Sequence, residues 1–328
     1  MKTTENKRRQ FLQLGLGATA GILTAGIGCK NANTETAQAS TSGCNATPEQ
    51  DLGPFYPNKK NGDGDVDLTI VQGKKGQAEG EVILVRGSVT DENCQPIEGV
   101  LVEIWQANRH GRYSHEGDTN NDNPLDPNFE GWGEMATGPG GAYGFKTIKP
   151  GSYAIGEDEW RTPHIHFRVS RRGYHEVVTQ MYFEGEKLNE TDSVLAESSE
   201  EEQSQLILTP GEGEGGIPVF KFNLSLRKVA TLAERNAALD AFAGKYDLLE
   251  EGEAAQVLTF RRDGNQLFHD LPDYTSVELK PDGKDEFLAK PIYRRFAFQR
   301  SADGSVQSVT LTTTSKVEEM KPMVAMKL

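Results

Sequence analysis

Short apolar stretches recur between about residue 80 and residue 226, and their pattern is that of β-strands. In Val100–Trp105, for example, the β-branched residues fall at every second position, which places them on one face of a strand. Glycine and proline separate the stretches, as at Gly138–Gly141 and Lys149–Gly151, and no long helical period interrupts them. The predicted strands are Glu81–Val89, Val100–Trp105, Ala142–Ile148, His164–Ser170, Val177–Phe183, Gln205–Thr209 and Val219–Leu226. This pattern predicts a mainly β fold, an antiparallel β-sandwich.

A different pattern begins near Thr231. The sequence Thr231-Leu-Ala-Glu234 is a capping-box pattern and predicts a helix to about Phe242 that ends at Gly244. Asp-Gly pairs at 263–264, 282–283 and 303–304 then separate strand-like stretches, which predicts three successive hairpins. We interpret residues 229–328 as a small up-and-down β-meander that weakly resembles the lipocalin-like accessory domains of some exported bacterial enzymes.

The N-terminus has the pattern of a targeting segment. Arg8-Arg9-Gln10-Phe11-Leu12 is a twin-arginine motif, and a mild Gly- and Ala-rich apolar stretch follows it to Gly28. Cys29 then resembles a lipoprotein processing site, although Gly26 stands where such sites usually have leucine. Residues 1–28 are therefore interpreted as a twin-arginine signal and residues 29–50, rich in Asn, Thr, Ala, Ser and Gln, as a flexible linker. We expect export to the periplasm or the cell surface, with a membrane tether if Cys29 is lipidated.

Charge and cysteine content narrow the choices further. The formal net charge is -14, which argues against nucleic acid as a partner, because phosphate binding needs clustered Lys and Arg. The acidic run Glu197–Glu202 is interpreted as a solvated loop or short helix. Cys44 and Cys94 are able to pair in an exported chain, but the sequence leaves that pairing open.

The first chemical signal is His164-Ile165-His166. In a strand, residues i and i+2 face the same way, roughly 6–7 Å apart, which suits two ligands of one metal. Taken alone, such a pair is more often a coincidence than a metal site. A zinc hydrolase using both histidines is one alternative, but no Cys, Asp or Glu stands at a spacing that would complete an ordinary zinc site.

The surroundings of this pair resemble the intradiol dioxygenases, the family of protocatechuate 3,4-dioxygenase and catechol 1,2-dioxygenase. The resemblance runs from about Gly53 to Leu226, within a catalytic domain that we place at residues 51–228. Several blocks in the same order carry it, namely Gly53–Pro57, Val102–Asn108, Gly111–Tyr113, Leu125–Phe129, Lys146–Tyr153, Trp160–Phe167 and Thr179–Phe183.

The resemblance implies a set of site residues and a reaction. The ligands of Fe(III) would be Tyr113, Tyr153, His164 and His166. Two phenolates and two imidazoles form a hard, electron-rich set that suits ferric iron. Arg161 and Gln180 match catalytic positions next to the metal, and Tyr153 would also accept a substrate proton. The implied reaction uses O2 to cleave a catecholic ring between its hydroxyl-bearing carbons, giving a muconate-type diacid.

Two matters stay open. Arg161 could instead form a salt bridge with Glu157, Asp158 or Glu159, and the whole domain could be a non-catalytic extracytoplasmic binding module.

The chain also departs from the family. Leu52 replaces the common Glu before Gly53, and Ala154-Ile155 stands where protocatechuate enzymes have Pro-Trp. The segment that begins with Ala154-Ile155 helps to shape the expected pocket, so the sequence does not choose among catechol, protocatechuate and hydroxyquinol.

Overall fold

The computed structural model describes residues 44–58, 64–119, 121–229, 239–248, 256–272, 275–318 and 320–328. The predicted twin-arginine signal, Cys29, most of the linker and the predicted helix start at Thr231 lie outside these residues. Within the described ranges, no helix is long and apolar enough to cross a membrane.

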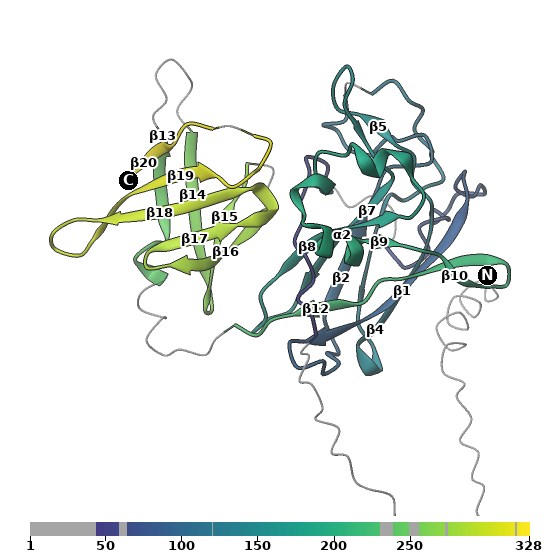
Figure 1. The fold of residues 1–328 in the computed structure, drawn as a ribbon, viewed down its shortest axis with the longest axis horizontal. Helices are drawn as coiled ribbons and strands as arrows, with labels where there is room; N and C mark the ends of the chain where they lie inside the picture. The colour runs from purple at the N-terminus through teal and green to yellow at the C-terminus, as the bar shows by residue number, and fades with distance from the viewer. Residues whose placement is uncertain are drawn as a thin grey trace, which may run out of the picture. The chain divides into compact units, whose positions relative to one another are not determined.

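Two five-stranded sheets make up the first part of the described chain (Figure 1). In one sheet, β1 (Val82–Asp91) pairs with β4 (Ala142–Ile148), β11 (Ile217–Lys221) and β12 (Leu224–Leu226), and β10 (Gly211–Glu214) pairs with β11. The other sheet has the order β3 (Trp132–Ala136), β2 (Leu101–Trp105), β7 (His164–Ser170), β8 (Val177–Phe183) and β9 (Ile207–Leu208). The mainly β fold is confirmed, although β1 pairs with β11 and β12, and β8 with β9, in parallel.

One apolar core joins the two sheets. Period-two alternation turns Ile83 and Val85 of β1 toward the same cluster as Ile165, Phe167 and Val169 of β7. Phe167 also contacts Phe222 edge-on, with ring centroids 5.1 Å apart. Because the odd-numbered residues of β7 face this core, the even-numbered residues His164 and His166 face the opposite side of the sheet.

The chain's two described cysteines are bonded. A disulfide joins Cys44, at the start of the described chain, to Cys94, in the turn after β1. The pairing that the sequence left open is therefore present in the structure. It ties the start of the described chain to the turn that follows β1.

The strand predicted at Gln205–Thr209 was wrong for its first half. Helix α2 covers Glu200–Leu206, and only Ile207–Leu208 remains as β9. A capping box starts the helix, because Ser199 and Glu202 bond each other's backbone N–H groups. The acidic run Glu197–Glu202, predicted to be a solvated loop or short helix, does become helical at Glu200, but Glu197 itself is not solvated. It is buried, and both of its carboxylate oxygens lie 2.9 Å from the backbone nitrogen of Lys316.

The C-terminal part is a closed eight-stranded barrel, shown in yellow-green in Figure 1. Its strands are β13 (Gly244–Leu248), β14 (Gln256–Asp263), β15 (Gln266–Asp270), β16 (Ser276–Gly283), β17 (Glu286–Ala289), β18 (Arg294–Arg300), β19 (Val306–Thr313) and β20 (Met323–Lys327). Each predicted Asp-Gly turn joins a hairpin, namely β14–β15, β16–β17 and β18–β19. Closure comes from β13 pairing with β20, and the interior is aromatic, with Tyr246, Phe260, Phe296 and Phe298 buried.

Candidate active site

The two histidines of the His-x-His pair occupy the first part of β7, on the face of the sheet opposite the core. Strand pairing places Trp105 of β2 and Gln180 of β8 on either side of His166. The Trp105 ring stacks on the His166 ring, with centroids 4.7 Å apart and planes 9° apart. Stacking against a buried indole limits the rotation of the imidazole. The sheet register therefore orients His166 before any ligand arrives.

The two tyrosines come from the segments that cover this face. Tyr113 lies in the long connection between β2 and β3, where its backbone N–H donates to Asp118 Oδ2 at 2.9 Å. Tyr153 lies in β5 (Tyr153–Ala154), which pairs with β6 (Trp160–Arg161) and so sets Tyr153 opposite Arg161. Both phenol rings are at most 5% exposed, and they meet edge-on with centroids 5.5 Å apart.

A glycine allows the two tyrosine segments to approach. Gly111 has φ +77°, and a Cβ atom there would lie 2.0 Å from the carbonyl oxygen of Ser152, the residue before Tyr153. No side chain can be placed at that distance without moving one segment away from the other. Gly111 therefore fixes the spacing between the backbones that carry Tyr113 and Tyr153.

We expect Gly111→Ala to lower the free energy of unfolding by at least about 2 kcal/mol more than Gly173→Ala does. Gly173 is the matched control, because its φ is +87° but an added Cβ would meet nothing within 4 Å. Both variants impose the backbone strain of a positive φ, and only Gly111→Ala adds the clash with Ser152. Urea unfolding of the two variants measures the difference in the free energy of unfolding. Equal losses of that free energy would show that the close approach of Gly111 to Ser152 is unimportant.

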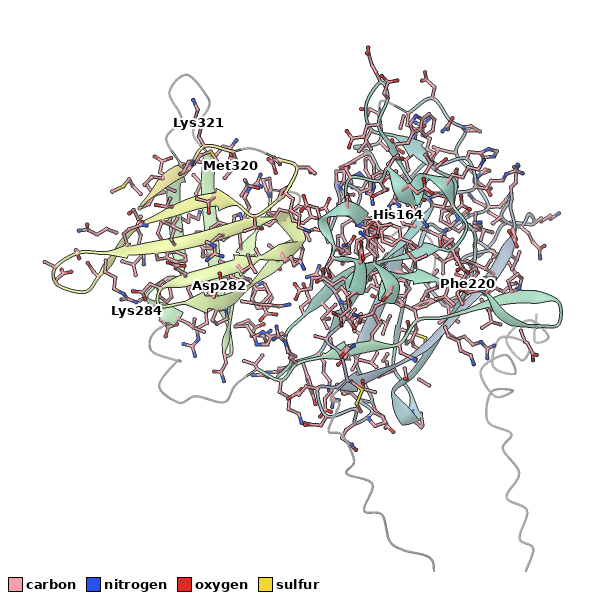
Figure 2. The ribbon with its side chains drawn as sticks, in the orientation of Figure 1. His164, Phe220, Asp282, Lys284, Met320 and Lys321 are labelled. Carbon is pink, nitrogen blue, oxygen red and sulfur yellow. A yellow bond between two sulfur atoms is a disulfide. The ribbon has the colours of Figure 1, made fainter. Side chains whose placement is uncertain are left out.

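Donor atoms of these side chains converge on one point. His164 Nε2 lies 3.3 Å from Tyr113 Oη and 3.2 Å from His166 Nε2. Two atoms that bind one metal ion in adjacent positions, each at about 2.0–2.2 Å, are separated by roughly 2.8–3.4 Å. The three atoms therefore have the spacing of ligands to a common ion. Tyr153 completes the group, with its ring centroid 5.8 Å from that of His164. His164 lies among closely packed side chains of this part of the chain (Figure 2).

Burial sets the protonation of the group. The chief cause is loss of solvation, which lowers the pKa of His164 and His166 well below 6.5 and raises the pKa of Tyr113 and Tyr153 above 10. His164 Nδ1 lies 2.6 Å from the carbonyl oxygen of Thr162, which only accepts, so Nδ1 carries the proton and Nε2 offers its lone pair. The protein alone therefore keeps the phenols protonated, and a bound cation would be needed to hold them as phenolates.

The described residues contain no group of three or more His, Cys, Asp or Glu side chains that could hold a metal ion. Any metal at this point must therefore be bound through the tyrosines as well as the histidines. Phenolate and imidazole are donors that suit ferric iron, so the residues present fit the group that the sequence pattern implies.

Arg161 and Gln180 meet beside this cluster. The Arg161 side chain is buried and donates from Nη2 to Gln180 Oε1 at 2.7 Å and from Nε to Asp192 Oδ2 at 2.9 Å. The salt bridge that was the alternative role for Arg161 is therefore present, but its partner is Asp192. Glu157, Asp158 and Glu159, the partners suggested from sequence, are exposed. Gln180 in turn donates to the carbonyl oxygen of Asp51 at 2.7 Å.

Asp192 is the site residue that the sequence did not reveal. Its Oδ1 accepts from the backbone N–H groups of Val194 and Leu195, and its Oδ2 accepts from Thr162 N–H as well as from Arg161. From sequence, an aspartate two residues before Val194 indicates only a turn cap. Its pairing with Arg161 depends on the fold, which brings together residues 31 positions apart.

A cavity of about 590 Å³ opens beside Tyr153 and Arg161. This volume is within the range of small-molecule sites. Of the departures noted from the sequence, Ala154 and Ile155 do line it. The full lining is Asp51, Pro54, Phe55, Gly117, Asp118, Asn121, Tyr153, Ala154, Ile155, Gly156, Arg161 and Val194.

Comparisons with known proteins place this part of the chain among dioxygenases. A family described as "Dioxygenase" matches residues 52–228. The chain is 42% identical over 190 residues to the protocatechuate 3,4-dioxygenase beta chain of Burkholderia cepacia, over 56% of this chain and 80% of that protein. It is 34% identical over 169 residues to the catechol 1,2-dioxygenase of Candida albicans, over 46% of this chain and about half (52%) of that protein. Among solved structures, the dioxygenase domain of a dioxygenase and carbohydrate-binding fusion protein from Streptomyces sp. SirexAA-E is 26% identical, with a TM-score of 0.43, over 56% of this chain and 100% of that one.

Proposed function

The chain belongs to the intradiol ring-cleavage dioxygenases, and from this we propose that it binds Fe(III) through Tyr113, Tyr153, His164 and His166 and cleaves a catecholic diol with O2. Both oxygen atoms of O2 enter the product, a muconate-type diacid formed by breaking the bond between the two hydroxyl-bearing carbons. The observation that carries the proposal is the convergence of Tyr113 Oη and the two imidazole Nε2 atoms at 3.2–3.3 Å.

The side chains around the cavity have separate parts in this reaction. When bound, the ferric ion supplies the redox-active Lewis acid that makes the diol ring reactive toward O2. Tyr153 lines the cavity, and as a phenolate held by the bound ion it would accept a proton from the incoming diol at Oη. Burial raises the pKa of Tyr153, which favours this protonated product. Arg161 also lines the cavity, and its guanidinium stabilises negative charge that develops on the ring.

Two further residues position these groups. Gln180 and Asp192 hold two different nitrogens of Arg161, which leaves the guanidinium one orientation. Positioned donors of this kind need no reorganisation when charge develops, which is why they accelerate a reaction more than solvent does. Burial of all four ligand side chains also keeps bulk water away from their donor atoms.

We also propose that the protein acts outside the cytoplasm, exported by the twin-arginine route and tethered through a lipid on Cys29. The Arg8-Arg9 motif supports this proposal, and so does the Cys44–Cys94 disulfide, because disulfides persist in oxidising compartments. Twin-arginine export carries folded proteins, which agrees with an iron site that is loaded before export.

The proposed activity is expected to depend on iron. Purified protein loaded with iron should be red to burgundy and should consume O2 in the presence of catechol, in equal amounts with the muconate formed. Chelation should remove both the colour and the oxygen uptake, and Fe(III) but not Zn(II) should restore them. An oxygen electrode and visible absorption provide the two readouts. Activity that zinc restores, or a colourless protein that remains active, would contradict the proposal.

A further inference from the structure

The charge around the cavity points to the kind of diol that fits it. Of the described residues that line the cavity, Arg161 is the one cation. Its charge is already balanced by Asp192, whose side chain is fully buried 2.9 Å from Arg161 Nε. A carboxylate on a substrate would therefore find no unpaired cation in this wall.

Acidic groups surround the rest of the cavity. Asp118 lines it, and the Asp118 carboxylate accepts from Tyr113 N–H at 2.9 Å and from Asn121 Nδ2 at 3.3 Å, which are both neutral donors. Asp51 also lines the cavity, in the N-terminal segment that contributes Pro54 and Phe55. Neither aspartate forms an ion pair with a Lys or Arg side chain of the described residues. Burial raises the pKa of the Asp51 carboxyl, so Asp118 is the lining residue that contributes an acidic charge without a cationic partner.

The turn between β5 and β6 lines one side of the cavity, and we call this turn the mouth; it continues the acidic pattern. Ala154, Ile155 and Gly156 line the cavity, and the same turn between β5 and β6 continues through Glu157, Asp158 and Glu159. These three acidic side chains are exposed, and they form no ion pair within the part of the chain that the structure describes. A cleft rimmed by charges of one sign changes the local concentration of charged ligands, raising it for cations and lowering it for anions.

We infer that the enzyme takes diols whose ring substituent is neutral or cationic and discriminates against diols that carry a carboxylate. This inference rests on the proposed function, because it concerns the same cavity. The size of the cavity allows a substituent larger than a hydrogen atom, and Ile155, which is half exposed, offers an apolar surface for it. The carboxylate of protocatechuate would meet Asp118 or the acidic mouth, so similarity to a protocatechuate enzyme does not extend to this preference.

Three diols with matched side arms test the inference on the iron-loaded full chain. Dopamine, 3,4-dihydroxyphenylethanol and 3,4-dihydroxyphenylpropanoate carry short arms that end in an ammonium, a hydroxyl and a carboxylate. We expect kcat/KM to fall in that order, with the carboxylate at least about tenfold below the hydroxyl at low salt. The gap, meaning the ratio of kcat/KM for the hydroxyl arm to kcat/KM for the carboxylate arm, should narrow in about 0.5 M NaCl, because salt screens the exposed acidic groups.

Charge variants locate the effect. Glu157→Gln, Asp158→Asn and Glu159→Gln together should narrow the gap between carboxylate and hydroxyl arms, and Asp118→Asn should narrow it independently. The control is Glu81→Gln, Glu98→Gln and Glu212→Gln, which removes three exposed acidic groups that do not line the cavity and should leave the gap unchanged. Equal or faster cleavage of the carboxylate arm by the unaltered enzyme would overturn the inference and leave the proposed function standing. Failure to cleave catechol as well as these three diols would instead overturn the proposed function.

Discussion

Replacing His164 with alanine is expected to remove bound iron and to lower kcat/KM for diol cleavage by at least about a thousandfold. His164 Nε2 is the central atom of the donor group, within 3.3 Å of both Tyr113 Oη and His166 Nε2. Its lone pair is already directed at that point, because Nδ1 is committed to the Thr162 carbonyl.

Metal analysis and visible absorption of the purified variant measure the loss directly, separately from activity. His110→Ala is the matched control, because His110 lies near the surface and bonds Glu79 at 3.2 Å rather than the donor group. The control should keep its iron, its colour and its rate. A His164→Ala variant that keeps one iron per chain and most of its activity would show that the metal is held elsewhere.

Replacing Asp192 with asparagine is expected to lower the free energy of unfolding by about 3–5 kcal/mol, because it leaves the Arg161 charge buried without its partner. Each oxygen of Asp192 accepts from two donors, so an asparagine must point its NH2 group at one of these pairs. Arg161 should lose its orientation as a result, and kcat should fall about a hundredfold.

Arg161→Met separates the catalytic part of this pair from the structural part. Asp192 would still accept from three backbone N–H groups, so Arg161→Met should cost less stability than Asp192→Asn. It should nevertheless lower kcat at least as much, because the guanidinium is the group that faces the cavity. Urea unfolding and steady-state kinetics on both variants test this. If the variant that loses more stability also loses more kcat, the pair of Arg161 and Asp192 has only a structural role.

Local patterns in the sequence predict a large part of this fold. Short apolar stretches bounded by glycine and proline predict β1, β2, β4, β7 and β8, and the Asp-Gly pairs predict three hairpins, because both signals depend on neighbouring residues. The four candidate ligand residues also come from sequence, through motif blocks in a fixed order. The structure brings their side chains together, and their role as ligands remains a proposal.

Features that depend on distant residues were not predictable in this way. Closure of the barrel needs β13 to pair with β20, about eighty residues later, and no local signal marks that pairing. Asp192 reaches Arg161 only through the path of the chain between β8 and α2, and the nearer acidic residues Glu157–Glu159 were the more obvious partners in sequence. The C-terminal end of α2 was missed for another reason. Gln205 and Leu206 precede the apolar Ile207 and Leu208 of β9, so the stretch suggests one strand, whereas the helix that starts at the Ser199–Glu202 capping box continues to Leu206.

The most direct test of the central claim is the product formed from catechol in an atmosphere of ¹⁸O2. The account predicts a muconate that carries both labelled oxygen atoms, at least one of them in nearly every molecule even if the second exchanges with water. The label should appear with the iron-loaded full chain and disappear with His164→Ala. A yellow semialdehyde from cleavage beside the diol, or a product without label, would contradict the proposed reaction at this site.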